Sequence, residues 1–298
     1  MTKFVELLIS GVSLGFIYAL IALGFVVIYK ATEVISFVHG SLLLLGGYII
    51  ARTHKDYGFY TSVVIALIAV GILAVVIEFL LIRPLRQRGS DPVAPTILTI
   101  GVDIILLTDL TRRLGANVYG LGDPWGDKVV HLGDYVLPQA RLAAIVVALV
   151  LLALFLLATK YTGWGIAMRS TAEDGEAAAL MGVRMGRVSS LSWLIAGLLA
   201  VVAGVFLTAN PSPGLNSTTG LGALKAFPAA ILGGLDSPGG VLVGGLAIGL
   251  SETLVGGYQD RFTWLGGGIG NVTPWIVMLI VLLIRPSGLF GTRELTRV

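Results

Sequence analysis

The chain has 298 residues, of which 56% are hydrophobic and 12% are charged, and 40 of them are glycines. With a mean hydropathy of +0.92, this composition is too apolar for a soluble domain and is typical of a polytopic α-helical membrane protein. A net charge of +3 requires no nucleic-acid partner, because positive loops kept on one side of a membrane account for it. The lack of cysteine excludes disulfides, thiolate metal sites and cysteine nucleophiles.

The sequence contains nine apolar runs, which can be compared with the length of about 20 residues that a helix needs to cross a bilayer. In chain order they cover residues 7–29, 34–51, 61–82, 93–110, 142–159, 191–209, 224–235, 241–255 and 272–284. The seventh and eighth runs are short, and Asp236-Ser237-Pro238-Gly239-Gly240 separates them, which indicates a broken or re-entrant pair. We therefore predict an all-α integral membrane protein with eight or nine transmembrane or re-entrant segments, which form one membrane domain over residues 1–298.

The first run contains Gly11-Val12-Ser13-Leu14-Gly15, which matches the nucleophile elbow of hydrolases. That motif requires a strand, a sharp turn and a helix, whereas the run predicts one continuous helix. Glycines four residues apart, Gly11 and Gly15, instead favour close packing of this helix on another. The histidines have no metal-binding spacing, and no glycine-rich loop ends in Lys followed by Ser or Thr. We predict no catalytic site, no metal site and no ATPase site in this chain.

Three polar residues in the second and fourth runs are candidates for a functional site, because ionisable groups inside a membrane are costly and usually functional. His39 and Ser41 lie near the start of the second run, and Asp103 lies near the middle of the fourth. We predict that they line a substrate path; the alternative is a structural hydrogen bond to a neighbouring helix. Local pairing or snorkelling is expected for three other charged residues near the ends of runs, Glu78, Lys225 and Glu252.

Basic loops set the predicted orientation, because short loops rich in Lys and Arg stay on the cytoplasmic side. Three such loops occur: residues 83–88, residues 160–187, and the tail with Arg285, Arg293 and Arg297. This assignment places the C-terminus in the cytoplasm, the loop of residues 111–139 outside, and the N-terminus outside as well.

Residues 160–189 join two apolar runs on the predicted cytoplasmic side and include a charged, helix-forming sequence. Ser170 and Glu173 form a capping box, and Gly182 is placed to end the helix. We predict a helix of about three turns with its acidic residues near the positive end: Glu173, Asp174 and Glu176. Its small alanine face suits close docking of a partner. The alternative is a solvated helix that only connects two spans.

Glycines are dense from the seventh run to the eighth, where they allow backbones to approach each other or a helix to break. The residues concerned are Gly233, Gly234, Gly239, Gly240, Gly244 and Gly245. We predict helix packing or breaks at these positions, with ordinary small-residue packing as the alternative to a role in transport.

Four stretches resemble the permease family of high-affinity branched-chain amino acid ABC importers. They are residues 15–29, 34–48, 168–183 and 224–245, in the order in which the family has them. Within the third, Glu176-Ala177-Ala178 followed by Gly182 resembles the coupling motif of ABC importer permeases, a cytoplasmic helix that sits in a groove of the ATPase subunit. In the fourth, Asp236-Ser237-Pro238 departs from the expected glycine and serine pattern, which bears on the substrate more than on the family.

The resemblance implies a permease subunit of the bacterial inner membrane that works by alternating access and has no ATPase of its own. Its implied partners are a second related permease, two cytoplasmic ATPases that bind ATP and Mg, an external substrate-binding protein and membrane lipid. The residues implied to transmit ATPase movement are Thr171, Glu173, Asp174, Glu176, Ala177, Ala178 and Gly182.

Three alternatives remain. A related amide, urea or sugar permease would share the architecture. A stand-alone secondary transporter or channel would need no ATPase. A membrane-embedded enzyme would need a cluster of catalytic residues, and the sequence shows no such cluster.

Overall fold

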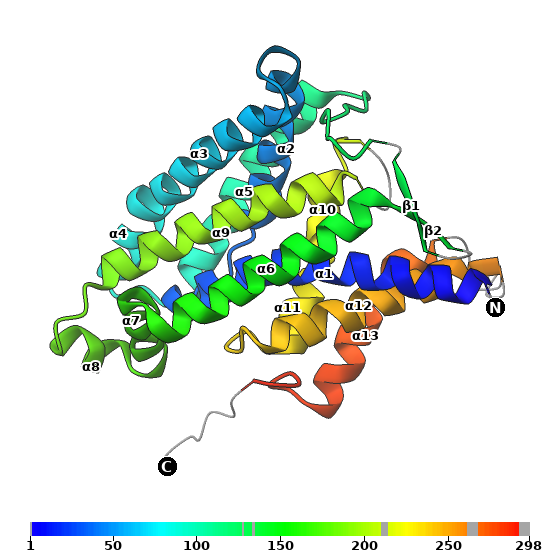
Figure 1. Ribbon diagram of the computed structural model, residues 1–298. Coiled ribbons are helices and arrows are strands. Elements are labelled where there is room, and N and C mark those ends of the chain that lie inside the picture. The colour runs from blue at the N-terminus through cyan, green and yellow to red at the C-terminus, as the bar shows by residue number, and fades with distance from the viewer. Residues whose placement is uncertain (1, 127, 133–134, 210–213, 261–267, 292–298) are drawn as a thin grey trace.

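The computed structural model describes residues 2–126, 128–132, 135–209, 214–260 and 268–291. Figure 1 shows inclined helices with a β-hairpin near one end. Within the described residues, six helices are long and apolar enough to cross a membrane, and shorter apolar helices accompany them. The predicted polytopic α-helical fold is therefore confirmed.

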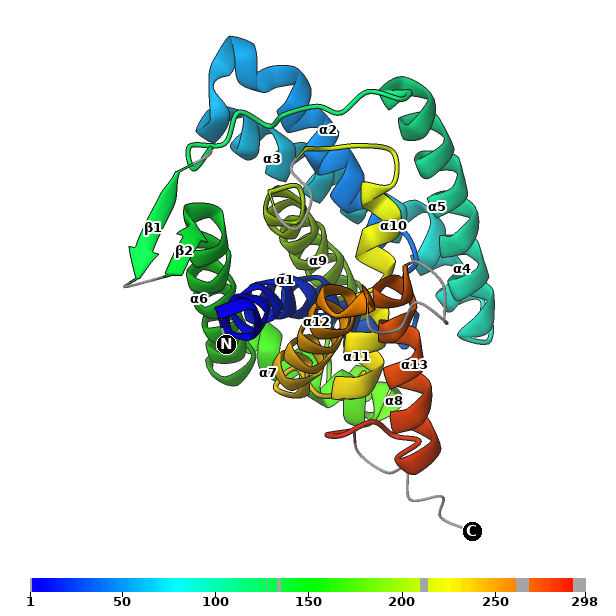
Figure 2. The same ribbon diagram turned by 90° about the vertical axis from the view of Figure 1, so that its right-hand side faces the viewer.

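Helix α1 (Thr2–Thr32) lies at the centre of the molecule. Its sequence is apolar on every side, and such a helix is stable only where protein or lipid surrounds it. In its most apolar window, 94% of the residues are buried inside the protein. Figure 2 shows the helices around it, and these neighbours are α6 (Gln139–Tyr161), α9 (Met185–Leu207) and α12 (Gly240–Gly257).

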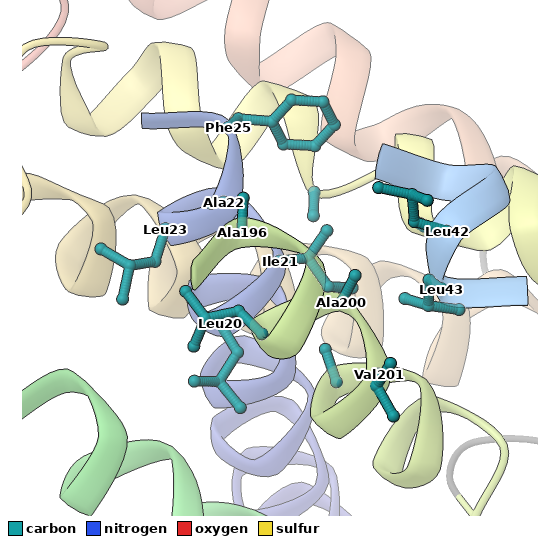
Figure 3. Packing of buried hydrophobic residues seen from close by; sticks show 14 of the residues in the cluster. Leu20, Ile21, Ala22, Leu23, Phe25, Leu42, Leu43, Ala196, Ala200 and Val201 are labelled. Carbon is teal, nitrogen blue, oxygen red and sulfur yellow. The ribbon is translucent and has the colours of Figure 1, made fainter. Parts of the chain in front are cut away.

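The apolar core lies where α1 meets α9 and α2 (His39–Tyr57). Figure 3 shows interleaved side chains from these three helices, among them Ile21, Leu43 and Val201, each without exposed surface. Small residues on α9, such as Ala200, let α1 and α2 approach closely. Between membrane helices this van der Waals packing supplies most of the attraction, because lipid tails are as apolar as the side chains.

The third apolar run forms α3 (Phe59–Ile77) and the π-helical turn η1 (Glu78–Ile82), and the basic loop after it forms α4 (Arg83–Gln87). Gly58 joins α2 to α3 with a φ of 76°, a conformation that favours glycine. The fourth run forms α5 (Val93–Leu114). The outer faces of α3 and α5 expose branched apolar residues, as expected for contact with lipid: Ile68, Ile72, Ile104 and Ile105.

A β-hairpin precedes α6, which the all-helical expectation missed. Strand β1 (Val129–Leu132) pairs antiparallel with β2 (Tyr135–Pro138), and Val129 lies opposite Pro138. Val and Tyr favour strands, but four residues a strand are too few to give a clear alternating pattern.

The seventh apolar run forms α11 (Phe227–Gly233), and an additional short helix, α10 (Thr219–Leu224), ends where that run begins, with Lys225 and Ala226 between the two helices. Pro228 lies in the first turn of α11, where a proline needs no amide hydrogen and fits the start of a helix. The predicted interruption before the eighth run is also present, because α12 begins only at Gly240. Helix α13 (Ile269–Ile284) completes the described helices.

Helices α1 and α12 pack backbone to backbone through glycines. A β-carbon added to Gly245 would lie 2.6 Å from the carbonyl oxygen of Gly15, and one added to Gly15 would lie 3.0 Å from the carbonyl oxygen of Gly245. A β-carbon on Gly11 would lie 3.3 Å from the carbonyl oxygen of Gly249. Gly11 and Gly15 thus lie in a helix–helix seam, inside a continuous helix with no elbow.

A second glycine seam holds α11 against α12. A β-carbon on Gly233 would lie 2.6 Å from the carbonyl carbon of Gly240, and one on Gly244 would overlap the carbonyl oxygen of Ala229. Gly234 ends α11 with a φ of 97°. Gly239 lies at the break itself, directly before α12, and a β-carbon there would meet no atom within 4 Å.

The predicted basic loops gather at one end of the molecule, which we call the α8 end after helix α8 (Gly175–Leu180). Arg86 and Lys30 line a cavity with α8, and Lys30 Nζ donates to the carbonyl oxygen of Asp236 at 3.0 Å. The opposite end, which we call the hairpin end, holds the β-hairpin and the start of α1 (Figure 1). Arg293 and Arg297 lie outside the described residues.

Candidate functional site

The segment at the α8 end consists of two helices, α7 (Gly163–Glu173) and α8, instead of the predicted helix of three turns. The chain is extended at Asp174, with φ −156° and ψ 101°, and the Asp174 carboxylate accepts a hydrogen bond from the backbone N–H of Ala177 at 2.9 Å. Ser170, the expected cap, lies inside α7 and donates to the carbonyl oxygen of Ile166. Aspartate competes well for an N-cap position, and Gly175 weakens helix continuation, so the break falls at this pair.

Helix α8 ends at Gly182 in a Schellman motif. Gly182 has a φ of 87°; its N–H donates to the carbonyl oxygen of Ala179, and the N–H of Val183 donates to that of Ala178, both at 3.0 Å. These two bonds satisfy carbonyl groups that the end of a helix leaves free. The glycine ends the helix as the sequence pattern favours.

The exposed face of α8 combines acidic and apolar side chains. Leu180 and Met181 are 88% and 86% exposed, next to the exposed Glu176. Ala178 and Thr171 face inward and are buried. Large apolar side chains that project this far from a protein surface are typical of a contact with another protein.

A polar cavity of about 420 Å³ lies behind α8. It is lined by the end of α1, by α4 and by the α7–α8 segment, through charged residues that include Lys30, Glu33, Arg86, Asp174 and Glu176. The Thr171 hydroxyl at the same cavity donates to the carbonyl oxygen of Ala167 at 2.8 Å. Helix α8 is therefore held over the end of the central helix and not on a free loop.

A buried ion pair connects η1 and α4 with the start of α9. Glu78 is 1% exposed and lies 3.2 Å from the Arg83 guanidinium, which confirms the local pairing expected from the sequence. Arg83 also donates to the carbonyl oxygen of Gly186 and to Ser190 Oγ, and Ser190 donates to Glu78. Because Gly186 and Ser190 lie in the first turns of α9, this network ties the start of α9 to η1 and α4.

The three predicted path residues fall into two groups. The Ser41 hydroxyl donates to the Asp103 carboxylate, so these two residues link α2 to α5. His39 is fully buried, and its ring lies 5.0 Å from the ring of Phe25 on α1. Within the described residues neither ring nitrogen of His39 has a hydrogen-bond partner. A path role for these residues stays a prediction.

A charged cluster that the sequence analysis did not assemble joins α1, α12, α13 and the break between α10 and α11. Glu252 accepts hydrogen bonds from Tyr18 and Lys225, and Lys225 also donates to Asn271. The sequence feature that could have indicated this cluster is the pair of opposite charges, Lys225 and Glu252, in adjacent apolar runs. Tyr18 lies 234 residues from Glu252 in the chain, so its contribution required the fold.

Comparison with known proteins adds relatives along the whole chain. A family model described as the permease component of the branched-chain amino acid transport system matches residues 7–284. The high-affinity branched-chain amino acid transport system permease protein LivH of Escherichia coli K12 is 30% identical, with 99% of this chain and 98% of that protein covered. LivH of Salmonella typhimurium is also 30% identical, and BraD of Pseudomonas aeruginosa is 28% identical, both with the same coverage.

Proposed function

The chain belongs to the family of branched-chain amino acid transport permease components, and from this membership we propose that it imports branched-chain amino acids across the bacterial inner membrane. It acts as a transport subunit together with a second related permease. Two ATPase subunits that bind ATP and Mg drive it, and an external binding protein delivers the substrate.

The observation that carries the proposal is the extent of the match. The family model covers residues 7–284, and the alignment with the Escherichia coli protein covers 98% of that protein. Each helix from α2 to α13 lies within the family match. The likeness to the family therefore extends over the membrane helices and is not confined to one motif.

The segment formed by α7 and α8 is suited to receive movement from an ATPase. Its two exposed apolar side chains, Leu180 and Met181, provide a contact, and the acidic residues beside them provide a charged rim. Movement of α8 would pass along the chain to α9, which Arg83 and Glu78 join to η1 and α4, and would reach α1 through the cavity that Lys30 lines. In this proposal the α8 end faces the cytoplasm and the hairpin end faces the binding protein.

Purification in mild detergent followed by mass spectrometry tests the partners, and reconstitution of the recovered complex in liposomes tests transport. We expect two ATPases, a sister permease and ATP-driven uptake of leucine supplied with the binding protein. Recovery of the chain alone, with gradient-driven flux, would establish a stand-alone transporter or channel. Uptake of an amide, urea or a sugar in place of leucine would identify a related permease that has the same architecture and a different substrate.

A further inference from the structure

Four polar side chains from separate segments, Glu252 among them, form one cluster. The Tyr18 hydroxyl donates to one carboxylate oxygen of Glu252, and Lys225 Nζ donates to the other, each at 2.7 Å. Lys225 Nζ also donates to the amide oxygen of Asn271 at 2.6 Å. The cluster holds one positive and one negative group, and both carboxylate oxygens of Glu252 are engaged.

The cluster extends from the interior to the surface of the chain. Tyr18 is 2% exposed, whereas the side chains of Glu252 and Lys225 are 12% and 23% exposed and Asn271 is exposed. Charged groups inside membrane proteins are costly, and they normally face a partner, a cavity or a transport path.

Lys225 lies where the backbone is not continuously helical. It follows the last residue of α10, and α11 begins two residues later at Phe227. Interrupted helices at membrane depth are tolerated where they are buried or line a cavity, and in many transporters they form the substrate site. The charge pair and the helix break thus fall at one place in the fold.

We propose that Lys225 and Glu252 bind the two charged groups of an amino acid as it passes through the permease, with Tyr18 as a positioning residue for Glu252. The proposal rests on the function proposed above. The substrate carboxylate pairs with Lys225 and the substrate ammonium pairs with Glu252, while Asn271 continues to hold Lys225.

Charge balance favours a zwitterion as the ligand. A molecule with one positive and one negative group can separate the Lys225–Glu252 pair and leave each charge with a partner, whereas an uncharged sugar would leave the pair intact. Apolar contacts for a branched side chain lie one helical turn away. Leu221 lies in α10, four residues before Lys225, and Trp275 shares a helix face with Asn271; both apolar side chains are exposed.

The test compares variants in the complete transport complex, reconstituted in liposomes with the binding protein and radiolabelled leucine. The double variant Lys225→Met, Glu252→Gln removes both charges together, so that no unpaired charge remains in the membrane. A matched control, Asp109→Asn, removes a carboxylate that is paired with Arg112 and Arg113 on the exposed end of α5. Uptake and ATP hydrolysis are measured in the same samples.

We expect the double variant to assemble and hydrolyse ATP, but to import less leucine per ATP by about tenfold or more, as follows from loss of charge-assisted bonds to the substrate. Tyr18→Phe should lower the same ratio to a smaller extent, and Asp109→Asn should leave it unchanged.

If the wild-type complex imports leucine and the double variant imports it equally well, the cluster is only structural. Absence of leucine uptake by the wild-type complex would instead contradict the proposed function. If the double variant fails to assemble, Tyr18→Phe decides: an unchanged ratio overturns the proposal.

Discussion

At the residue scale, Gly245 allows α1 and α12 to lie close together, because an added β-carbon would come within 2.6 Å of the Gly15 carbonyl oxygen. Gly245→Ala should therefore destabilise the protein by about 1–3 kcal/mol, as overpacking does in other cores. Thermal unfolding in detergent measures the effect. Gly101→Ala on α5 is the matched control, since a β-carbon there meets no atom within 4 Å, and its Tm should be unchanged or slightly higher. Equal Tm values for both variants would contradict the packing argument.

The ion pair of Glu78 and Arg83 allows a second prediction for single residues. Arg83→Met leaves the carboxylate of Glu78 buried without its charged partner, which should cost about 3–5 kcal/mol. The double variant Glu78→Gln, Arg83→Met should recover part of this loss, because no unpaired charge remains. Unfolding of both single variants and the double variant gives the coupling free energy directly. A double variant no more stable than Arg83→Met would assign the effect to the contacts of Arg83 with Gly186 and Ser190.

At the scale of elements, helix α8 offers a contact that can be removed without disturbing the core. Leu180 and Met181 are 88% and 86% exposed, so Leu180→Ser with Met181→Ser should leave the Tm unchanged. The same variant should bind the ATPase subunits at least about tenfold more weakly, because buried apolar anchors dominate protein contacts. Affinity capture of the ATPases on the immobilised permease measures this. Tyr161→Ser, a 69% exposed residue at the same end, is the control and should retain binding.

The sequence was sufficient for most elements of this fold because long apolar runs form helices at nearly their own bounds. The prediction failed at the α7–α8 junction, where it placed the cap at Ser170, although the chain breaks at Asp174 and Gly175 and Asp174 caps α8. The prediction from the sequence also took Lys225 and Glu252 as separate residues at the ends of apolar runs. Their cluster with Tyr18 depends on the packing of α1 against α12, which no local pattern encodes.

At the scale of the whole molecule, the two ends differ in the residues that they present. The α8 end gathers the basic loops and the polar cavity, and the hairpin end gathers the β-hairpin, the turn between α2 and α3 and the loop after α5 (Figure 1). We expect the helices that cross between these ends to place the two sets of loops on opposite sides of a membrane. The rule for basic loops assigns the α8 end to the cytoplasm.

Because the chain contains no cysteine, single cysteines can report this orientation without a modified background. Asn117→Cys is exposed at the hairpin end, and Lys160→Cys is exposed at the α8 end. A membrane-impermeant maleimide should label Asn117→Cys in right-side-out vesicles and Lys160→Cys only in inverted vesicles. The reverse pattern would place the α8 end outside, where no cytoplasmic ATPase could reach it. Labelling of both positions in the same vesicles would show that the two ends do not lie on opposite sides of the membrane.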